Sequence, residues 1–236
     1  IRRNPRGDAV SDYKFLDNVH MMVSAPTGGG KSYFVGWMAE KLYEARKRFI
    51  ILDTKTKNHI GLVALKNLKL LKIKPNTQYD YWKLVNYDQI LCIPTERTKT
   101  KELINHYRAI LDVIFSAKKP ITVFVEEAHN YNPNPHVPDE LLELIAREGR
   151  SSRINLIFIT QRIQDFPKLL WSQCKLTYLF KFMIPQDIKY IGRMIPDFEK
   201  LNKELQRYDV LEFDHYSNEL KIIRASEVVR RTKHYG

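Results

Sequence analysis

The sequence is poor in cysteine and glycine and contains no long apolar run. Its two cysteines, Cys92 and Cys174, are too few for a disulfide framework, and each lies in an apolar stretch. We therefore expect buried free thiols in a reducing compartment, not a metal site. There is no run of 18 or more apolar residues and no recognisable secretory signal, so we expect no membrane span and a cytoplasmic protein.

Acidic residues are also in short supply. The chain has 39 lysines and arginines against 27 aspartates and glutamates, a net charge of +12 over 236 residues. This imbalance favours a polyanionic partner, usually a nucleic acid, over an inert basic surface. The length is near the upper limit for one hydrophobic core, which predicts a single large domain over 18–236 after a basic arm at 1–17.

Three of the nine glycines are consecutive, and they form the core of the most informative motif. An apolar run at 18–23 leads into a loop and then into a helix-period segment that begins at Lys31. The loop reads Ala25, Pro26, Thr27, Gly28, Gly29, Gly30, Lys31 and Ser32. Glycines let backbone N–H groups converge on an anion, Lys31 can reach the β- and γ-phosphates, and Ser32 can ligate Mg²⁺. The stretch predicts a phosphate-binding loop for ATP, with Ala25 where the usual pattern has glycine.

Further apolar runs alternate with helix-period segments, which is typical of a mainly parallel α/β sheet. We predict strands at 48–53, 90–94, 121–125, 154–160 and 176–182, and a C-terminal hairpin at 209–213 and 220–223. The predicted helices span 31–47, 102–117, 139–148, 166–172, 185–191 and 196–205, with Gly149 as the helix-terminating glycine after 148. The stretch 54–89 is ambiguous: lysines between leucines indicate either a basic helix facing DNA or a solvated face over core residues.

The strand at 121–125 ends in two carboxylates, Glu126 and Glu127. The carboxyl ends of parallel strands form the ligand crevice of an open sheet, so this pair is expected to meet the phosphate-binding loop there. Glu126 is then the residue that holds Mg²⁺, and Glu127 the base that activates water. His129 lacks partners at metal-ligand spacing, and we interpret it as a positioning residue.

Three segments together resemble the HerA/FtsK superfamily of DNA-translocating P-loop ATPases: the loop 25–32, the strand end Glu126 to Asn130, and the stretch from Arg147 to Arg162 with its terminal Thr160-Gln161-Arg162. They define a motif core at 18–165 and leave 166–236 as a C-terminal extension. The resemblance implies a RecA-like fold, with Gln161 as the polar sensor of the γ-phosphate and Arg150 as an arginine finger that reaches a neighbouring subunit. Arg147 and Arg153 are the substitutes for Arg150.

Within the superfamily, the lean core most resembles the genome-packaging ATPases of membrane-containing icosahedral viruses. This implies ATP hydrolysis coupled to movement of double-stranded DNA by a homo-oligomeric ring, expected to be hexameric, with capsid or portal-vertex proteins as partners, in the host cytoplasm or on the virion. Backbone-phosphate contacts from segments such as 54–60 and 131–138 would grip the DNA. The alternatives are a cellular or plasmid translocase or helicase of the same superfamily, and a nucleotide-switched DNA-binding or assembly protein with little turnover.

Overall fold

The computed structural model describes residues 13–235, and its centre is one nine-stranded sheet. The strands are β1 (His20–Ser24), β2 (Phe49–Leu52), β3 (Lys69–Ile73), β4 (Gln89–Pro94), β5 (Ile121–Val125), β6 (Ile154–Thr160), β7 (Cys174–Leu179), β8 (Val210–Asp214) and β9 (Glu219–Ile223). Their order across the sheet is β3-β4-β2-β5-β6-β1-β7-β8-β9. All pairs among the first seven strands are parallel, whereas β8 pairs antiparallel with both β7 and β9. The predicted mainly parallel α/β fold is confirmed, and the C-terminal hairpin extends the same sheet.

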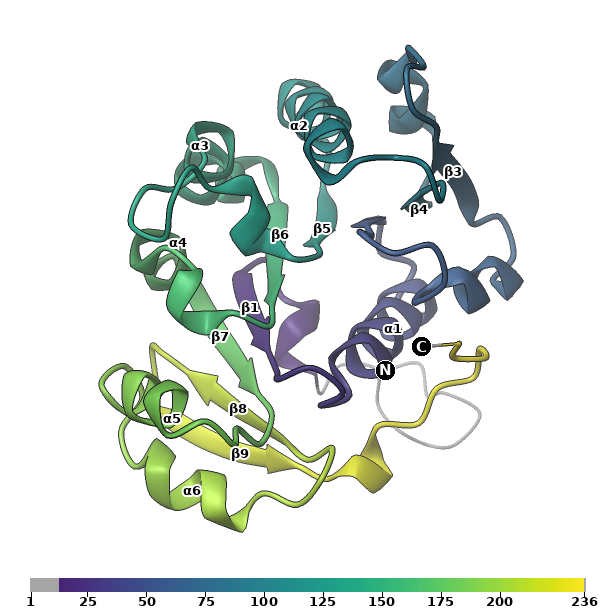
Figure 1. Cartoon of the computed structure of the whole chain (residues 1–236). Helices are drawn as coiled ribbons and strands as arrows, with labels where there is room; N and C mark the ends of the chain where they lie inside the picture. The colour runs from purple at the N-terminus through teal and green to yellow at the C-terminus, as the bar shows by residue number, and fades with distance from the viewer. Residues whose placement is uncertain (1–12, 236) are drawn as a thin grey trace.

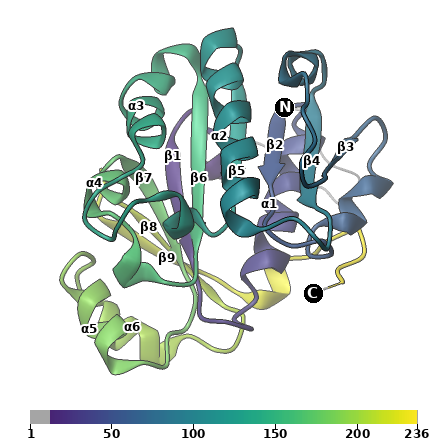
Figure 2. The same cartoon turned by 45° about the horizontal axis from the view of Figure 1, so that its top comes forward.

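Helices cover both faces of this sheet (Figures 1 and 2). They are α1 (Lys31–Glu44), α2 (Thr100–Ala117), α3 (Glu140–Glu148), α4 (Lys168–Ser172), α5 (Pro185–Gly192) and α6 (Phe198–Glu204). Side chains of α1 pack with one face of the strands in one hydrophobic cluster, and those of α2, α3 and α4 pack with the other face in a second. The strands alternate between the two clusters: Met22 belongs to the second, Met21 and Val23 to the first. Both faces being covered explains why the central strands are continuously apolar.

β3 resolves part of the ambiguous stretch as solvated lysines over core-packed leucines, carried on a strand and not on a helix. Lys69 and Lys72 belong to an edge strand paired with β4, and both side chains are exposed. Lysines on an exposed edge discourage pairing with another chain. The leucine–lysine alternation is therefore a strand pattern, and the helix interpretation of this stretch was wrong.

Gly149 does not end α3 in the way that the sequence predicts. Its backbone stays right-handed (φ −60°), and the chain continues as a short 3-10 turn to Ser152. Arg153 adopts the left-handed conformation instead, with φ 56°. The space around Gly149 gives a reason for glycine, because an added Cβ would lie 3.0 Å from Ile145 Cγ2 and 3.2 Å from the carbonyl oxygen of Ile154. Close packing against β6 therefore explains this glycine.

The two cysteines are buried and free, as predicted. Of the predicted N-terminal arm, residues 1–12 lie outside the described part of the chain. Residues 14–16 form a 3-10 turn in which Phe15 is buried, with its ring 5.4 Å from that of Trp37 on α1. Within 13–235, every helix is too short or too polar to cross a membrane.

Candidate active site

Four neighbouring strands, β2, β5, β6 and β1, end at the same edge of the sheet. The chain continues from them into Asp53, the pair Glu126-Glu127, Gln161 and the loop 25–32 respectively. Parallel strands put these ends side by side, which is where an open α/β sheet binds ligands. Segments far apart in the sequence thus meet at one edge, as the motifs predict.

The loop 25–32 has the backbone that its glycines allow. Gly28 and Gly30 have φ 73° and 97°, the left-handed region that favours glycine. Gly30 is the N-cap of α1, so Lys31 opens the helix and the loop faces its positive end. The loop is therefore shaped to receive an anion.

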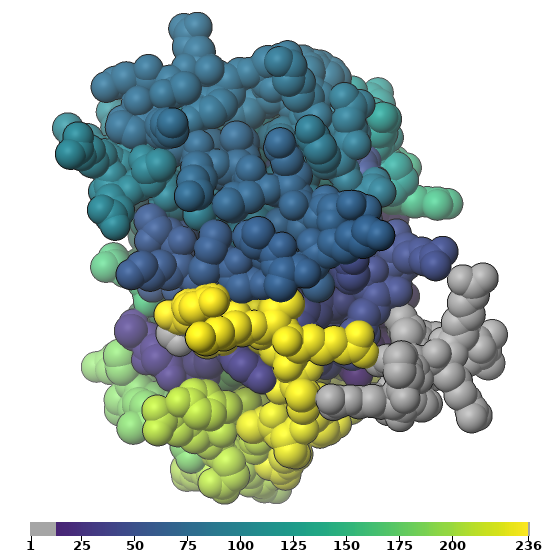
Figure 3. Space-filling view, turned by 90° about the vertical axis from the view of Figure 1, so that its right-hand side faces the viewer, coloured from purple at the N-terminus to yellow at the C-terminus, as the bar shows by residue number. Residues whose placement is uncertain are grey.

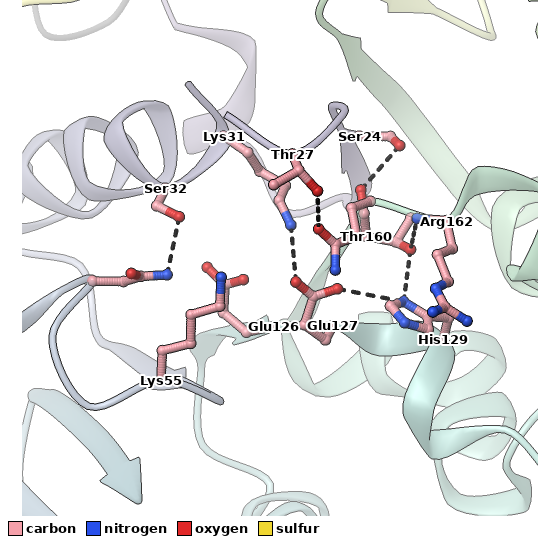
Figure 4. A network of polar contacts seen from close by, with 12 residues as sticks. Ser24, Thr27, Lys31, Ser32, Lys55, Glu126, Glu127, His129, Thr160 and Arg162 are labelled. Atoms are coloured by element: carbon pink, nitrogen blue, oxygen red, sulfur yellow. Dashed lines mark hydrogen bonds and ion pairs between the residues drawn. The ribbon is translucent and has the colours of Figure 1, made fainter. Parts of the chain in front are cut away.

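Lys31 and Glu127 are in contact, as Figure 4 shows: Lys31 Nζ lies 3.3 Å from Glu127 Oε1, and both side chains are largely buried. Glu127 has φ 48°, a strained left-handed conformation for a glutamate. Its second oxygen, Oε2, is 3.5 Å from His129 Nδ1 and accepts no hydrogen bond from the described residues. Oε1 thus faces Lys31, whereas the buried Oε2 faces His129 without accepting a hydrogen bond.

The end of β6 connects the loop to the acidic pair. Thr160 Oγ1 accepts a hydrogen bond from the backbone N–H of Arg162 and lies 2.9 Å from His129 Nδ1. The next residue, Gln161, accepts a hydrogen bond of 2.9 Å from the hydroxyl of Thr27. Burial lowers the pKa of His129, so the ring is neutral at pH 7 and Thr160 orients it. The structure therefore places Gln161 against the phosphate-binding loop.

Glu126 has a different environment, because a histidine that the sequence analysis did not single out binds it. His59 Nε2 lies 2.8 Å from Glu126 Oε1, with neither side chain more than 3% exposed. Burial opposes ionisation of Glu126, but the hydrogen bond from His59 and the charge of Lys31 hold its pKa below the ordinary value. Burial raises the pKa of neighbouring Asp53 to about 7. Asp53 was detectable as the acidic residue that ends a buried strand, whereas no local pattern marks His59.

A cavity of about 520 Å³ lies over these groups. At one end it is lined by the loop 26–32 together with Lys55, Asn58, Glu126, Glu127 and Gln161. Asn58 donates a hydrogen bond of 3.2 Å to Ser32 Oγ. Lys55 and Asn58 thus line this cavity, although Lys55 is also exposed to solvent, and His59 is buried.

The residues at this end suit Mg²⁺ shared with phosphates. Mg²⁺ prefers oxygen ligands and is usually held by one or two carboxylates plus phosphate oxygens and waters. Ser32 and Glu126 supply a hydroxyl and an ionised carboxylate, and both residues line the cavity. Among residues 13–235 no cluster of three or more His, Cys, Asp or Glu could hold a metal by itself. The donor set fits an ion that arrives with a nucleotide.

Arg150 lies at the amino ends of the parallel strands, whereas the cavity lies at their carboxyl ends. It precedes β6, whereas Gln161 follows it, and the seven residues of that strand span about 20 Å. Its guanidinium Nη1 donates to the hydroxyl of Tyr216 in the β8–β9 turn, and its carbonyl accepts from the side chain of Asn18. Of the two substitutes, Arg147 pairs with Glu143 on its own helix, and Arg153 is an exposed turn residue. None of the three arginines approaches the cavity of its own subunit.

The motifs and this geometry agree with comparisons to known proteins. The family model for the central domain of helicase HerA matches residues 12–169, which is more than half of the chain. The chain belongs to the HerA central-domain family. It is thus a HerA/FtsK-type P-loop ATPase domain, and the suspected resemblance is confirmed.

Two curated relatives carry the HerA name. The probable DNA double-strand break repair helicase HerA of Methanocaldococcus jannaschii is 33% identical over 104 residues, 43% of this chain and 19% of the relative. HerA of Pyrococcus furiosus is 29% identical over 116 residues, 47% of this chain and 20% of the relative. This chain's match therefore spans about a fifth of their length.

Solved structures show the same fold. The genome-packaging NTPase B204 of Sulfolobus turreted icosahedral virus 2, in complex with ATP-γ-S, superimposes with a TM-score of 0.67 at 16% identity, covering 88% of this chain and 97% of that one. The bacterial conjugative coupling protein TrwB gives a TM-score of 0.66 at 9% identity, covering 94% and 88%. The RecA-like architecture is confirmed.

Proposed function

We propose that this protein is an ATPase that uses ATP hydrolysis to move double-stranded DNA, as the motor of viral genome packaging. The observation that carries the proposal is the 3.3 Å contact between Lys31 and Glu127 in a cavity that also contains Ser32, Glu126 and Gln161. A lysine for phosphate, a carboxylate for water and a polar group at the loop are the parts that phosphoryl transfer needs. The net charge of +12 supports a DNA partner.

The side chains divide the chemistry between them. The loop 25–32 holds the triphosphate, and Lys31 leaves Glu127 to pair with the β- and γ-phosphates. Glu127 is then free to orient the attacking water and take its proton, while Gln161 contacts the γ-phosphate. Ser32 and Glu126 would hold Mg²⁺, which neutralises charge on the phosphates when it is bound. His59 keeps Glu126 ionised and fixed for that role.

Arg150 completes a neighbour's site in this proposal. Because it lies at the far edge of its own sheet, a head-to-tail arrangement of subunits is needed to bring it to a cavity. A ring closes such an arrangement, and each subunit then both contains a site and supplies an arginine. We propose a hexameric ring around the DNA, working with capsid or portal-vertex proteins.

The packaging assignment is supported by B204, a viral genome-packaging NTPase whose chain is covered almost completely. The alternative within the same family, a cellular or plasmid translocase or helicase, is favoured by the HerA relatives. Position of the gene beside capsid genes would support packaging, and position beside repair or conjugation genes would support the alternative.

The enzymatic proposal is tested by measuring ATP turnover with and without duplex DNA for the wild type, Lys31→Ala and Glu127→Gln. We expect DNA to stimulate the wild type and expect stimulation to weaken steeply with added salt. Lys31→Ala should lose nucleotide binding and turnover. Glu127→Gln should still bind ATP but hydrolyse it at least about 100-fold more slowly, since a general base contributes about 10²–10⁴ in rate.

Glu96→Gln is the matched control, because this glutamate is exposed in the loop after β4 and does not line the cavity. It should behave as the wild type. Unchanged turnover in both site variants would overturn the proposal. Slow turnover that ignores DNA would favour a nucleotide-switched DNA-binding or assembly protein in place of a motor.

A further inference from the structure

The cavity over the phosphate-binding loop has a second end of different chemistry. That end is lined by Tyr33 and Phe34 of α1's first turn and by Phe180, Tyr208, Val210, Ala225, Val228 and His234. Carboxylate and amide side chains line only the phosphate end, as far as residues 13–235 are concerned. A single cavity thus joins an anion-binding loop to an aromatic and apolar wall. A ligand made of phosphate alone would contact the loop and leave the wall without a partner.

Tyr208 forms the rim of this wall directly beside the loop. A Cβ added to Gly30 would lie 2.8 Å from Tyr208 Cδ1 and 3.3 Å from Phe180 Cε1, so the tyrosine ring is packed against the loop glycine. The side chain is 43% exposed, and the guanidinium carbon of Arg207 lies 4.8 Å from the ring centroid. Tyr208 also has φ 70°, a conformation that non-glycine residues adopt mainly where surrounding structure enforces it. An aromatic ring is held open to solvent at the mouth of the cavity.

Another part of the wall comes from the C-terminal segment, residues 225–235. Figure 3 shows this segment in yellow, lying as a band against the blue part of the chain that follows β2. The close approach of Lys233 to Gly61 agrees with that view, since an added Cβ at Gly61 would collide with the Lys233 carbonyl. Val228 and His234 reach the cavity from this segment.

A buried carboxylate on α1 fixes the C-terminal segment. Glu40 accepts hydrogen bonds from the backbone N–H groups of Arg231 (2.7 Å) and Thr232 (3.0 Å) and from the Thr232 hydroxyl (2.6 Å). It also pairs with the guanidinium of Arg230 at 3.4 Å, and neither of these two side chains is more than 3% exposed. Because α1 starts at the loop, Glu40 ties the wall and the phosphate cradle to one rigid element.

A second tie lies at the start of the segment. Asp209, the residue after Tyr208, accepts hydrogen bonds from the Ala225 N–H (3.0 Å) and from Arg224 Nη1 (2.7 Å). The rim tyrosine and the beginning of the C-terminal segment are therefore joined through one carboxylate. Both sides of the wall are held in place by the fold itself.

We propose that Tyr208, Val228 and His234 form a subsite for the base of a nucleoside triphosphate, and that Glu40 holds this subsite in register with the phosphate-binding loop. The inference rests on the proposed nucleotide site and deepens it. A nucleoside triphosphate has a polyanionic end and a flat π-system, which match the two ends of the cavity. Inorganic tripolyphosphate would fill the cradle and leave the wall in water.

The test compares binding of a non-hydrolysable ATP analogue and of inorganic tripolyphosphate to the full chain by calorimetry, with Mg²⁺ present. In the wild type the analogue should bind about tenfold or more tightly than tripolyphosphate, from the stacking and burial of the base. Tyr208→Asn removes the ring while asparagine tolerates the positive φ. It should weaken the analogue about tenfold and leave tripolyphosphate unchanged.

Tyr87→Asn is the matched control: its ring is 37% exposed, carries a lysine over its face as Tyr208 carries an arginine, and lies outside the cavity. It should bind both ligands as the wild type does. Glu40→Gln should weaken the analogue selectively, with thermal unfolding measured alongside to show that the variant is folded. If Glu40→Gln does not fold, Tyr208→Asn still tests the subsite, because the Tyr208 side chain is at the surface and its loss should leave the fold intact.

The two levels of the proposal fail separately. If Tyr208→Asn affects the analogue and tripolyphosphate equally, or affects neither, the base subsite is wrong. If Lys31→Ala binds both ligands as the wild type does, the nucleotide site itself is wrong.

Discussion

At the scale of single residues, the two adjacent glutamates of the site are held in opposite ways. Glu126 is immobilised by a buried hydrogen bond to His59, whereas Glu127 turns through a left-handed backbone conformation toward Lys31 and keeps one oxygen unpaired. Strain of this kind is tolerated where surrounding structure determines the conformation, and it is common at active sites. One carboxylate is thus anchored and the other is left available.

A residue-scale prediction concerns His20 at the start of β1. Burial, aided by the charge of Arg150, lowers the pKa of His20 from 6.5 to about 4, and its Nδ1 accepts a hydrogen bond from the Leu156 N–H. As the pH falls below 6.5, His20 binds a proton in the unfolded chain but not in the folded one. The free energy of unfolding therefore declines until about pH 4. The difference corresponds to at most about 3 kcal/mol of unfolding free energy.

Urea unfolding at several pH values, for the wild type and His20→Asn, measures this contribution. The variant should be less stable at pH 7 but should lose less stability between pH 7 and pH 4.5, because asparagine does not titrate. Parallel pH profiles for the two proteins would show that His20 is not responsible.

At the scale of secondary structure, caps and edges decide boundaries that periodicity alone does not. Asp139 is the N-cap of α3, and its side chain accepts a hydrogen bond of 3.1 Å from the Leu142 N–H. The same carboxylate forms an ion pair with Arg108, whose Nε donates to it at 2.7 Å. This cap ends the proline-containing loop after β5 and starts the helix that leads to Arg150. The same residue therefore supports both the loop and the helix.

We expect Asp139→Ala to lower the free energy of unfolding by about 1–2 kcal/mol, mainly through loss of the cap. Asp139→Asn keeps a capping oxygen and loses the ion pair with a partly exposed arginine, so it should cost less. Chemical denaturation of both variants makes the comparison. Equal losses in alanine and asparagine would assign the effect to the ion pair instead of the cap.

At the scale of the whole molecule, the proposed site lies at the carboxyl ends of the parallel strands and Arg150 lies at their amino ends. The length of β6 keeps the arginine about 20 Å from the cavity of its own subunit, further than its side chain can span. A finger role for Arg150 is therefore possible only between subunits. Within its own subunit, the Arg150 guanidinium lies at the molecular surface, where it donates a hydrogen bond to the Tyr216 hydroxyl.

This arrangement predicts complementation between two inactive variants. Arg150→Ala has an intact cavity, and Lys31→Ala presents an intact arginine, so mixed assemblies should regain DNA-stimulated ATP turnover that neither variant shows alone. An arginine finger contributes about 10³–10⁵ in rate, so the recovery should be clear above background. Mixtures of Arg150→Ala with a Lys31→Ala, Arg150→Ala double variant should stay inactive. Recovery in that control, or none in the first mixture, would rule out the finger role.

The sequence by itself determined the order of the strands and helices other than β3, and it marked the loop 25–32 and the acidic pair. These depend on local patterns: continuous apolar runs for buried parallel strands, glycines for left-handed turns, and carboxylates at strand ends. The edge strand β3 was missed because exposed lysines on a half-buried strand produce the same alternation as a solvated helix face.

Only the tertiary structure decided which groups these motifs meet. His59 binds Glu126 across 67 positions, and the C-terminal segment reaches Glu40 across about 190. No local periodicity encodes such pairs, because they depend on the order of strands in the sheet and on where the chain returns over α1. For the same reason the sequence marked Arg150 but did not reveal that the sheet separates it from its own subunit's cavity.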